Sequence, residues 1–159
     1  MVEEAPSRWE TTLRQAIGSH INIAYCERLL QMASSGEYLC GEYLFREGES
    51  RRELYVVLEG KVDLRMTVPG RGSQRLLTVG PGELLAWSAI VGSGNMTCDG
   101  VATTDVVLAC FNAHKLESAF TEVPELGFQF MQWLATGVAA RLTATRLQML
   151  DLFTHEVRR

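Results

Sequence analysis

The stretch GELLAWSAIVGSGNMTCDGVA, residues 82–102, has the layout of a small-molecule pocket. Two strand-prone segments flank a turn, a tryptophan and a Gly-Ser-Gly-Asn loop. Backbone amides at the start of a short helix suit an anionic ligand, and a buried anion also needs a cation as its partner. Residues 83–104 contain no Arg or Lys, so the sequence predicts a pocket without that cation.

The side chains that most often perform catalysis or bind metals are scattered over the chain. They are Cys26, Cys40, Cys98, Cys110, His20, His114 and His155. They form neither a Cys-x-x-Cys nor a His-x-His pair, and no nucleophile-elbow motif occurs. We therefore expect no enzymatic activity, no metal and no cofactor. Haem ligation by Cys26, Cys40, Cys98 or His20 is an alternative that nothing in the sequence favours.

Length and composition indicate one globular domain, residues 1–159. The chain is 47% hydrophobic and 21% charged, as in ordinary globular proteins. No apolar run approaches the roughly 18 to 20 residues that span a bilayer. The start, residues 1–4, is acidic and unlike a secretory signal, so we expect a cytoplasmic protein without membrane contact. The net charge of −4 argues against DNA as a partner.

Hydrophobic periodicity divides the chain into three parts. Residues 1–35 have helical spacing, interrupted by a Gly-Ser pair. Residues 36–111 switch to short β-prone runs between Gly- and Pro-containing turns, which predicts an antiparallel sandwich, barrel or roll. Residues 112–155 return to helix. The predicted fold class is α+β, with helices at both chain ends.

Local signals set the expected element boundaries. Ser7 and Glu10 fit a capping box, Asn112 can cap a short helix, and Pro124 suits the first turn of a long helix that ends near Phe153. The predicted strands cover residues 38–40, 43–45, 54–58, 61–68, 74–79, 96–102 and 106–111.

Four segments occur in an order and at a spacing that characterise one family of sensor domains. They are GEYLFREGES (41–50), LYVVLEGKVDLRM (54–66), LLTVGPGELLAWSAIV (76–91) and VPELGFQFMQWLATGVAARL (123–142). In these segments and their order the chain resembles the cyclic-nucleotide-binding domain, the sensor half of catabolite-activator-type bacterial regulators. The resemblance implies an antiparallel β-roll, jelly-roll-like, that forms a pocket for cAMP or cGMP.

The phosphate-binding cassette of that family normally reads Gly-Glu, a short helix, then Arg-Ser/Thr-Ala. Its glutamate binds the ribose hydroxyl and its arginine neutralises the cyclic phosphate. Here Ala86-Trp87 stands at the Gly-Glu position, and Met96, Thr97 and Cys98 stand at the Arg-Ser/Thr-Ala positions. Loss of the arginine pair alone should weaken binding more than about a hundredfold. The usual cAMP or cGMP binding is therefore not expected.

The resemblance implies a pocket lined by the cassette residues themselves. The candidate lining is Leu85, Ala86, Trp87, Ser88, Ala89, Met96, Thr97 and Cys98. Trp87 either fills the space of the ribose or stacks on a planar ligand. The amides of Ser88 and Ala89 are candidates for a retained anion site.

The last predicted helix carries an apolar seam at alternating spacings of three and four residues. The seam is Met131, Ala135, Val138, Leu142, Thr145, Met149 and Leu152. It predicts a homodimer, as in the family; the alternative is packing within one subunit. A second apolar set, Leu126, Phe130 and Leu134, is expected to face the roll.

These observations predict a non-catalytic regulatory or sensor domain that signals through a dimerising last helix. DNA-binding relatives add a helix-turn-helix after this helix, and the sequence to Arg159 shows none, which favours a stand-alone regulator. Two alternatives stay open. One is a true cyclic-nucleotide receptor that uses backbone amides, and the other is a ligand-free dimeric adaptor for a partner protein.

Overall fold

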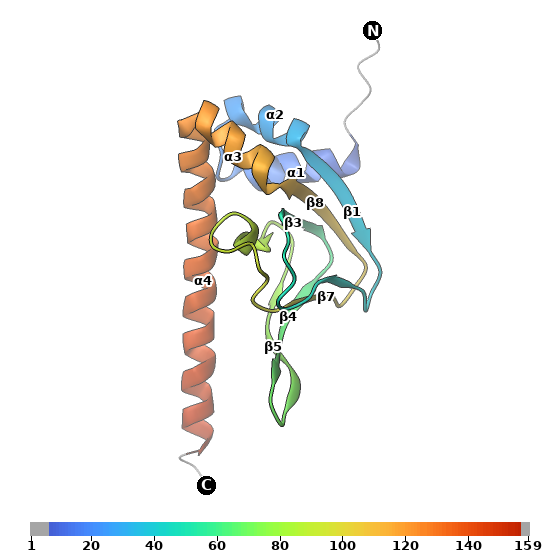
Figure 1. The fold of residues 1–159 in the computed structure, drawn as a ribbon, viewed down its shortest axis with the longest axis vertical. Helices are drawn as coiled ribbons and strands as arrows, with labels where there is room; N and C mark the ends of the chain where they lie inside the picture. Colours follow the sequence, from blue (N-terminus) through green and yellow to red (C-terminus); the bar gives the residue numbers. More distant parts are fainter. Residues whose placement is uncertain (1–6, 157–159) are drawn as a thin grey trace.

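The computed structural model describes the backbone of residues 7–156 and the side chains of residues 7–150. In this part of the chain, eight strands form two antiparallel sheets, and helices lie at both chain ends (Figure 1). The strand orders are β1-β8-β3-β6 and β2-β7-β4-β5. The predicted α+β class and antiparallel roll are confirmed.

Two helices precede the roll, α1 (Arg8–Gly18) and α2 (Ile23–Met32). The Ser7 and Glu10 capping box is present as predicted. The prediction of helix as far as residue 35 was wrong, because β1 (Ala33–Tyr38) begins directly after α2 and pairs with β8. The ladder with β8 satisfies the backbone groups of this polar segment, which has no apolar face to pack as a helix.

The remaining strands are β2 (Tyr43–Phe45), β3 (Glu53–Glu59), β4 (Val62–Val68), β5 (Gly72–Val79), β6 (Leu84–Leu85), β7 (Asp99–Ala102) and β8 (Val106–Asn112). The strand predicted from residue 96 starts three residues later. Met96 instead exchanges two backbone hydrogen bonds, both 2.8 Å, with Gly48 and Glu49. The two-residue strand β6 was not predicted, because it is too short to show a period.

Strand β3 is buried on both faces. Leu54, Val56 and Leu58 pack against the helices, whereas Tyr55 and Val57 point into the roll. This arrangement explains why the segment reads as a continuous apolar run without alternation. The molecule therefore has two apolar cores, one between helices and sheet and one between the sheets, which meet at this strand.

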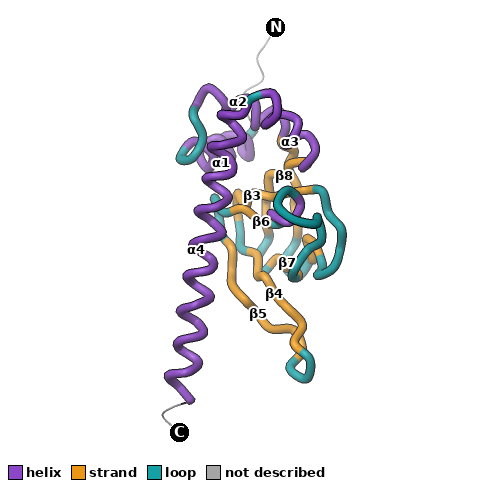
Figure 2. The backbone as a smooth tube through the Cα atoms, turned by 60° about the vertical axis from the view of Figure 1, so that its left-hand side comes forward, coloured by secondary structure: helices purple, strands orange, loops and turns teal. Residues whose placement is uncertain are grey.

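The roll is followed by α3 (Ala113–Glu122) and the long α4 (Pro124–Glu156). One end of α4 packs with α1, α2 and α3, and the helix then runs down the side of the roll (Figures 1 and 2). Leu126, Phe130 and Leu134, predicted to face the roll, are buried in the core that the helices share with one sheet. No described helix is long and apolar enough to cross a bilayer.

The turn between β3 and β4 provides a test of the roll. Gly60 has φ +85°, and a Cβ there would lie 2.2 Å from the carbonyl oxygen of Asp105. Gly41 has a similar φ of +92°, but an added Cβ would meet nothing within 4 Å. We expect Gly41→Ala to lower the free energy of unfolding by about 1 kcal/mol, because it adds only left-handed backbone strain. Gly60→Ala adds the clash as well, and we expect it to lower the free energy of unfolding by at least about 3 kcal/mol. Equal losses in urea denaturation would contradict the packing of this turn.

Candidate functional site

The cassette segment folds as a tight turn followed by a single helical turn. β6 leads through Ala86 into a short 3-10 helix, η1 (Trp87–Ala89). Ala86 has φ 58° and ψ 35°, a left-handed conformation that favours glycine. Ala86, predicted to stand at the family's glycine position, thus has a glycine-type backbone although it carries a methyl group. The Ala89 amide donates to the Ala86 carbonyl (3.0 Å), so it is not free for an anion.

A cavity of about 20 Å³ lies between the cassette and the roll. Its lining is Phe45, Leu64, Ala86, Trp87, Ser88, Met96, Thr97, Cys98 and Arg141. Six of the eight predicted pocket residues are brought together there. The other two, Leu85 and Ala89, are almost completely buried in the core instead. Phe45, Leu64 and Arg141 were not predicted.

Arg141 supplies the cation that the cassette lacks. Its Nη2 donates to the carbonyl oxygen of Leu84, and its guanidinium carbon lies 4.6 Å from the centroid of the Trp87 ring. Nε and Nη1 are buried and have no hydrogen-bond partner among the described residues. The prediction of a pocket without a cation was wrong, because α4 and not the cassette contributes the arginine.

The electrostatics of the cavity favour an anion. Burial lowers the pKa of Arg141, and the negative charge of Glu83 acts in the opposite direction. A guanidinium nevertheless remains protonated in proteins. The cavity therefore holds a fixed positive charge whose donors are incompletely satisfied. Such an arrangement can bind a hydrogen-bond acceptor.

Cys98 is no candidate for thiolate chemistry. Burial, followed by the charge of Asp99, raises the pKa of the Cys98 thiol to about 11. The thiol is thus almost entirely protonated near neutral pH.

The other candidate haem ligands, Cys26, Cys40 and His20, do not line this cavity. The His20 ring stacks on the Trp133 ring, with 5.1 Å between the ring centroids. In the described part of the chain, no three His, Cys, Asp or Glu residues could hold a metal ion together.

A second, larger cavity adjoins the first between the roll and α4. Its volume is about 270 Å³. It is lined by Leu64, Met66, Leu76, Leu77, Trp87, Thr97, Cys98, Val138, Arg141, Leu142 and Thr145. Five residues border both cavities: Leu64, Trp87, Thr97, Cys98 and Arg141. The two cavities therefore form one site at which strands β4 and β5, the cassette and α4 meet.

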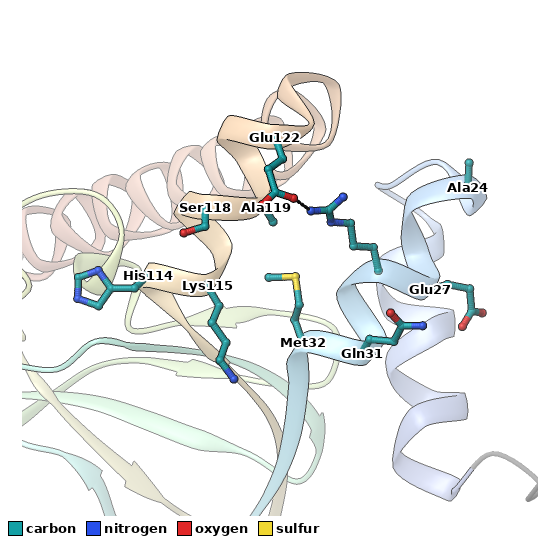
Figure 3. A pocket seen from close by; sticks show the side chains of 10 residues that line it. Ala24, Glu27, Gln31, Met32, His114, Lys115, Ser118, Ala119 and Glu122 are labelled. Carbon is teal, nitrogen blue, oxygen red and sulfur yellow. Dashed lines mark hydrogen bonds and ion pairs between the residues drawn. The ribbon is translucent and has the colours of Figure 1, made fainter.

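A wider hollow, about 850 Å³, is an open groove between α2 and α3 (Figure 3). An ion pair between Arg28 and Glu122 crosses it, and Lys115 and Met32 lie on its walls. Both ion-pair side chains are exposed, so the pair contributes little and is screened by salt. Among the described residues, the groove shows no buried unpaired polar group of the kind present at Arg141.

Arg141 left one signal in the sequence. Leu134, Val138, Arg141 and Thr145 follow each other at spacings of four, three and four residues. A charged residue within the stripe of a helix that faces a roll has to be buried or paired. The stripe therefore indicates that Arg141 is a cation held against the roll.

Comparisons with known proteins assign the family. Residues 36–122 match the family model described as "Cyclic nucleotide-binding domain". The chain is 30% identical over 118 residues to a CRP-like cAMP-activated global transcriptional regulator of Mycobacterium tuberculosis, covering 74% of this chain and 50% of that protein. It is also 30% identical over 119 residues to the cyclic AMP receptor protein of Thermus thermophilus, covering 75% and 53%. This chain belongs to the cyclic nucleotide-binding domain family.

Solved structures agree with this assignment. The N-terminal domain of a transcriptional regulator from Streptomyces coelicolor superposes with a TM-score of 0.67 at 30% identity, covering 87% of this chain and 94% of that one. A cyclic nucleotide-binding domain from Methylobacillus flagellatus has a TM-score of 0.82 at 17% identity, covering 91% and 84%, and supports the fold alone. The chain spans about half the length of the curated relatives it matches.

The left-handed backbone at Ala86 generates a prediction. Ala86→Gly removes the strain of a β-carbon in this conformation, but it also removes a buried methyl group. Because the two effects oppose each other, we expect the free energy of unfolding to stay unchanged or to rise by up to about 1 kcal/mol. Ala89 is buried in the neighbouring helical turn, and we expect Ala89→Gly to destabilise by about 1 to 2 kcal/mol. Chemical denaturation of both variants checks the turn. Equal destabilisation by the two changes would rule out the left-handed conformation.

Proposed function

We propose that this chain is a non-catalytic regulatory domain whose pocket controls α4 through Arg141 and does not take cAMP or cGMP in the usual way. The observation that carries the proposal is the position of Arg141. This one side chain belongs to α4, binds the backbone of β6 and covers Trp87. Any ligand that engages the guanidinium acts on the helix and the cassette together.

Three features argue against the usual nucleotide contacts. Met96, which the sequence places at the family's arginine position, is apolar and buried. The nearby carboxylate of Glu83 already accepts from the amide of Gly80 (2.7 Å) within the preceding turn. The space between Trp87 and Met96, about 20 Å³, and the adjoining cavity, about 270 Å³, are each smaller than the roughly 300 Å³ or more of ordinary small-molecule sites. A nucleotide would have to displace Trp87 and Arg141 before it could enter.

We therefore expect cAMP and cGMP to bind with dissociation constants above about 10 μM in isothermal calorimetry, a limit that corresponds to roughly −7 kcal/mol. The double variant Trp87→Glu/Met96→Arg should bind cAMP more tightly, because it restores both charged contacts. Tight binding of cAMP by the unmodified protein would overturn this part of the proposal. A double variant without gain would show that the shape of the pocket differs as well.

We also propose that α4 pairs with α4 of a second copy. Met131, Leu142 and Met149 of the predicted seam are 36%, 51% and 52% exposed, and Ala135 is exposed as well. Val138 packs against its own core instead, and Leu152 lies outside the described side chains. These residues form an apolar strip along α4 that a single chain leaves in water. The same strip on a second copy could cover it and remove both surfaces from water.

A charge on this strip tests the dimer. Met149→Glu should lower dimer stability by several kcal/mol, because two equivalent carboxylates would face each other in an apolar contact. Gln132→Glu places the same charge on another exposed position of α4 and should leave the dimer intact. Light scattering at tens of micromolar measures both. A monomeric unmodified protein, or a well-folded Met149→Glu dimer, would contradict the proposed interface.

A further inference from the structure

We infer that the cavity between the roll and α4 binds a small monocarboxylate with an apolar body, and that Arg141 holds the carboxylate. The inference rests on the proposed function, since it names the ligand class of the same pocket. It follows from the charge, the walls and the size of the cavity.

The charged end of the ligand is set by Arg141. Nε and Nη1 of the guanidinium are buried without an acceptor among the described residues, while Nη2 is occupied by the carbonyl of Leu84. Buried donors of a charged group are satisfied best by an anionic oxygen, and the planar guanidinium fits the two oxygens of a carboxylate. A ligand carboxylate would thus complete a set of contacts that the chain itself leaves incomplete.

One negative charge suits the site better than two. Arg141 is the only Arg, Lys or His in the described lining of either cavity. The carboxylate of Glu83 lies close enough to interact with the guanidinium electrostatically. A phosphate dianion would bring a second charge for which the lining offers no partner, and a buried unpaired charge is costly.

The walls of the larger cavity determine the rest of the ligand. Leu64, Met66, Leu76 and Leu77 form the side toward the roll, and Val138 and Leu142 form the side toward α4. Besides Arg141, the lining offers few polar groups, those of Trp87, Thr97, Cys98 and Thr145, and the Thr145 hydroxyl already donates to the carbonyl of Arg141. Most polar atoms of a ribose or purine would therefore stay unpaired. A linear alkyl chain or a phenyl ring would lose nothing by burial here.

The size of the cavity limits the length of that body. A volume of about 270 Å³ lies just below the range of roughly 300 to 1,000 Å³ that holds drug-sized ligands. At ordinary packing density it accommodates roughly ten to twelve non-hydrogen atoms. A phenyl-substituted or medium-chain carboxylic acid has this size, and a cyclic nucleotide is about twice as large.

The test uses 3-phenylpropionate and its neutral amide, 3-phenylpropionamide, as probes in isothermal calorimetry near neutral pH. We expect the carboxylate to bind with a dissociation constant below about 1 mM, and the amide at least about tenfold more weakly. Arg141→Met should abolish this preference, whereas Arg146→Met, at an exposed position of the same helix, should retain it. Leu76→Trp, at the partly exposed wall, should block the carboxylate while Arg141 stays in place.

Circular dichroism and thermal melting establish that each variant is folded. The inference is overturned if the folded unmodified protein binds no carboxylate at about 10 mM, if the amide binds equally well, or if folded Arg141→Met keeps the preference. A parallel titration with cAMP separates the two proposals. Tight cAMP binding refutes the proposed pocket function, whereas absence of both ligands refutes the carboxylate site alone.

Discussion

The burial of β3 on both faces is the constraint on which the other parts of the structure depend. Val56 and its neighbours on one face belong to the helix core, and Tyr55 and Val57 belong to the roll core. A strand that supplies side chains to both cores cannot shift by one residue without exchanging its two apolar sets. Helices and roll are therefore locked into one relative position, and every element that pairs with β3 is placed with it.

The geometry of the candidate site depends on β3, because β3 holds β6 in place. β6 pairs with β3 through the contacts of Tyr55 with Leu85 and of Val56 with Leu84. The Leu84 carbonyl is thus fixed by the central strand, and it is the group to which Arg141 donates. The path from β3 through β6 to Arg141 connects the buried centre of the roll to the helix that leaves it. Movement of α4 relative to the roll has to break or replace this hydrogen bond.

The sequence was sufficient for the parts that local chemistry determines. Helix starts at Ser7 and Asn112 follow from side chains that cap their own backbone, and the inner face of α4 follows from its apolar period. The family resemblance also located the cassette turn, where Ala86 keeps the backbone of a glycine. The extended residues 33–35 were missed, because their conformation depends on β8, which is distant in the sequence.

The cassette pattern alone could not assign Arg141 to the pocket, for the same physical reason. Its role arises from packing between α4 and β6, and no local pattern reports how far a helix reaches along a roll. Trp87 and Met96, at the positions predicted for the family's glutamate and arginine, indicated a loss of charged side chains from the cassette. They did not indicate that a cation had been supplied from another element. An arginine absent from the cassette is therefore not an absent charge, because Arg141 of α4 lies over Trp87.

The location of the cation also changes how a ligand could act. An arginine within the cassette would hold an anion against the roll, and α4 would respond only through secondary contacts. Arg141 is carried by α4 itself, so an anion that engages Nε and Nη1 competes with or supports the bond to the Leu84 carbonyl directly. A ligand shifts a conformational equilibrium only by its difference in affinity between the two states. In the proposed function that difference would arise at one guanidinium, because a movement of α4 would change the distance between Arg141 and the cassette.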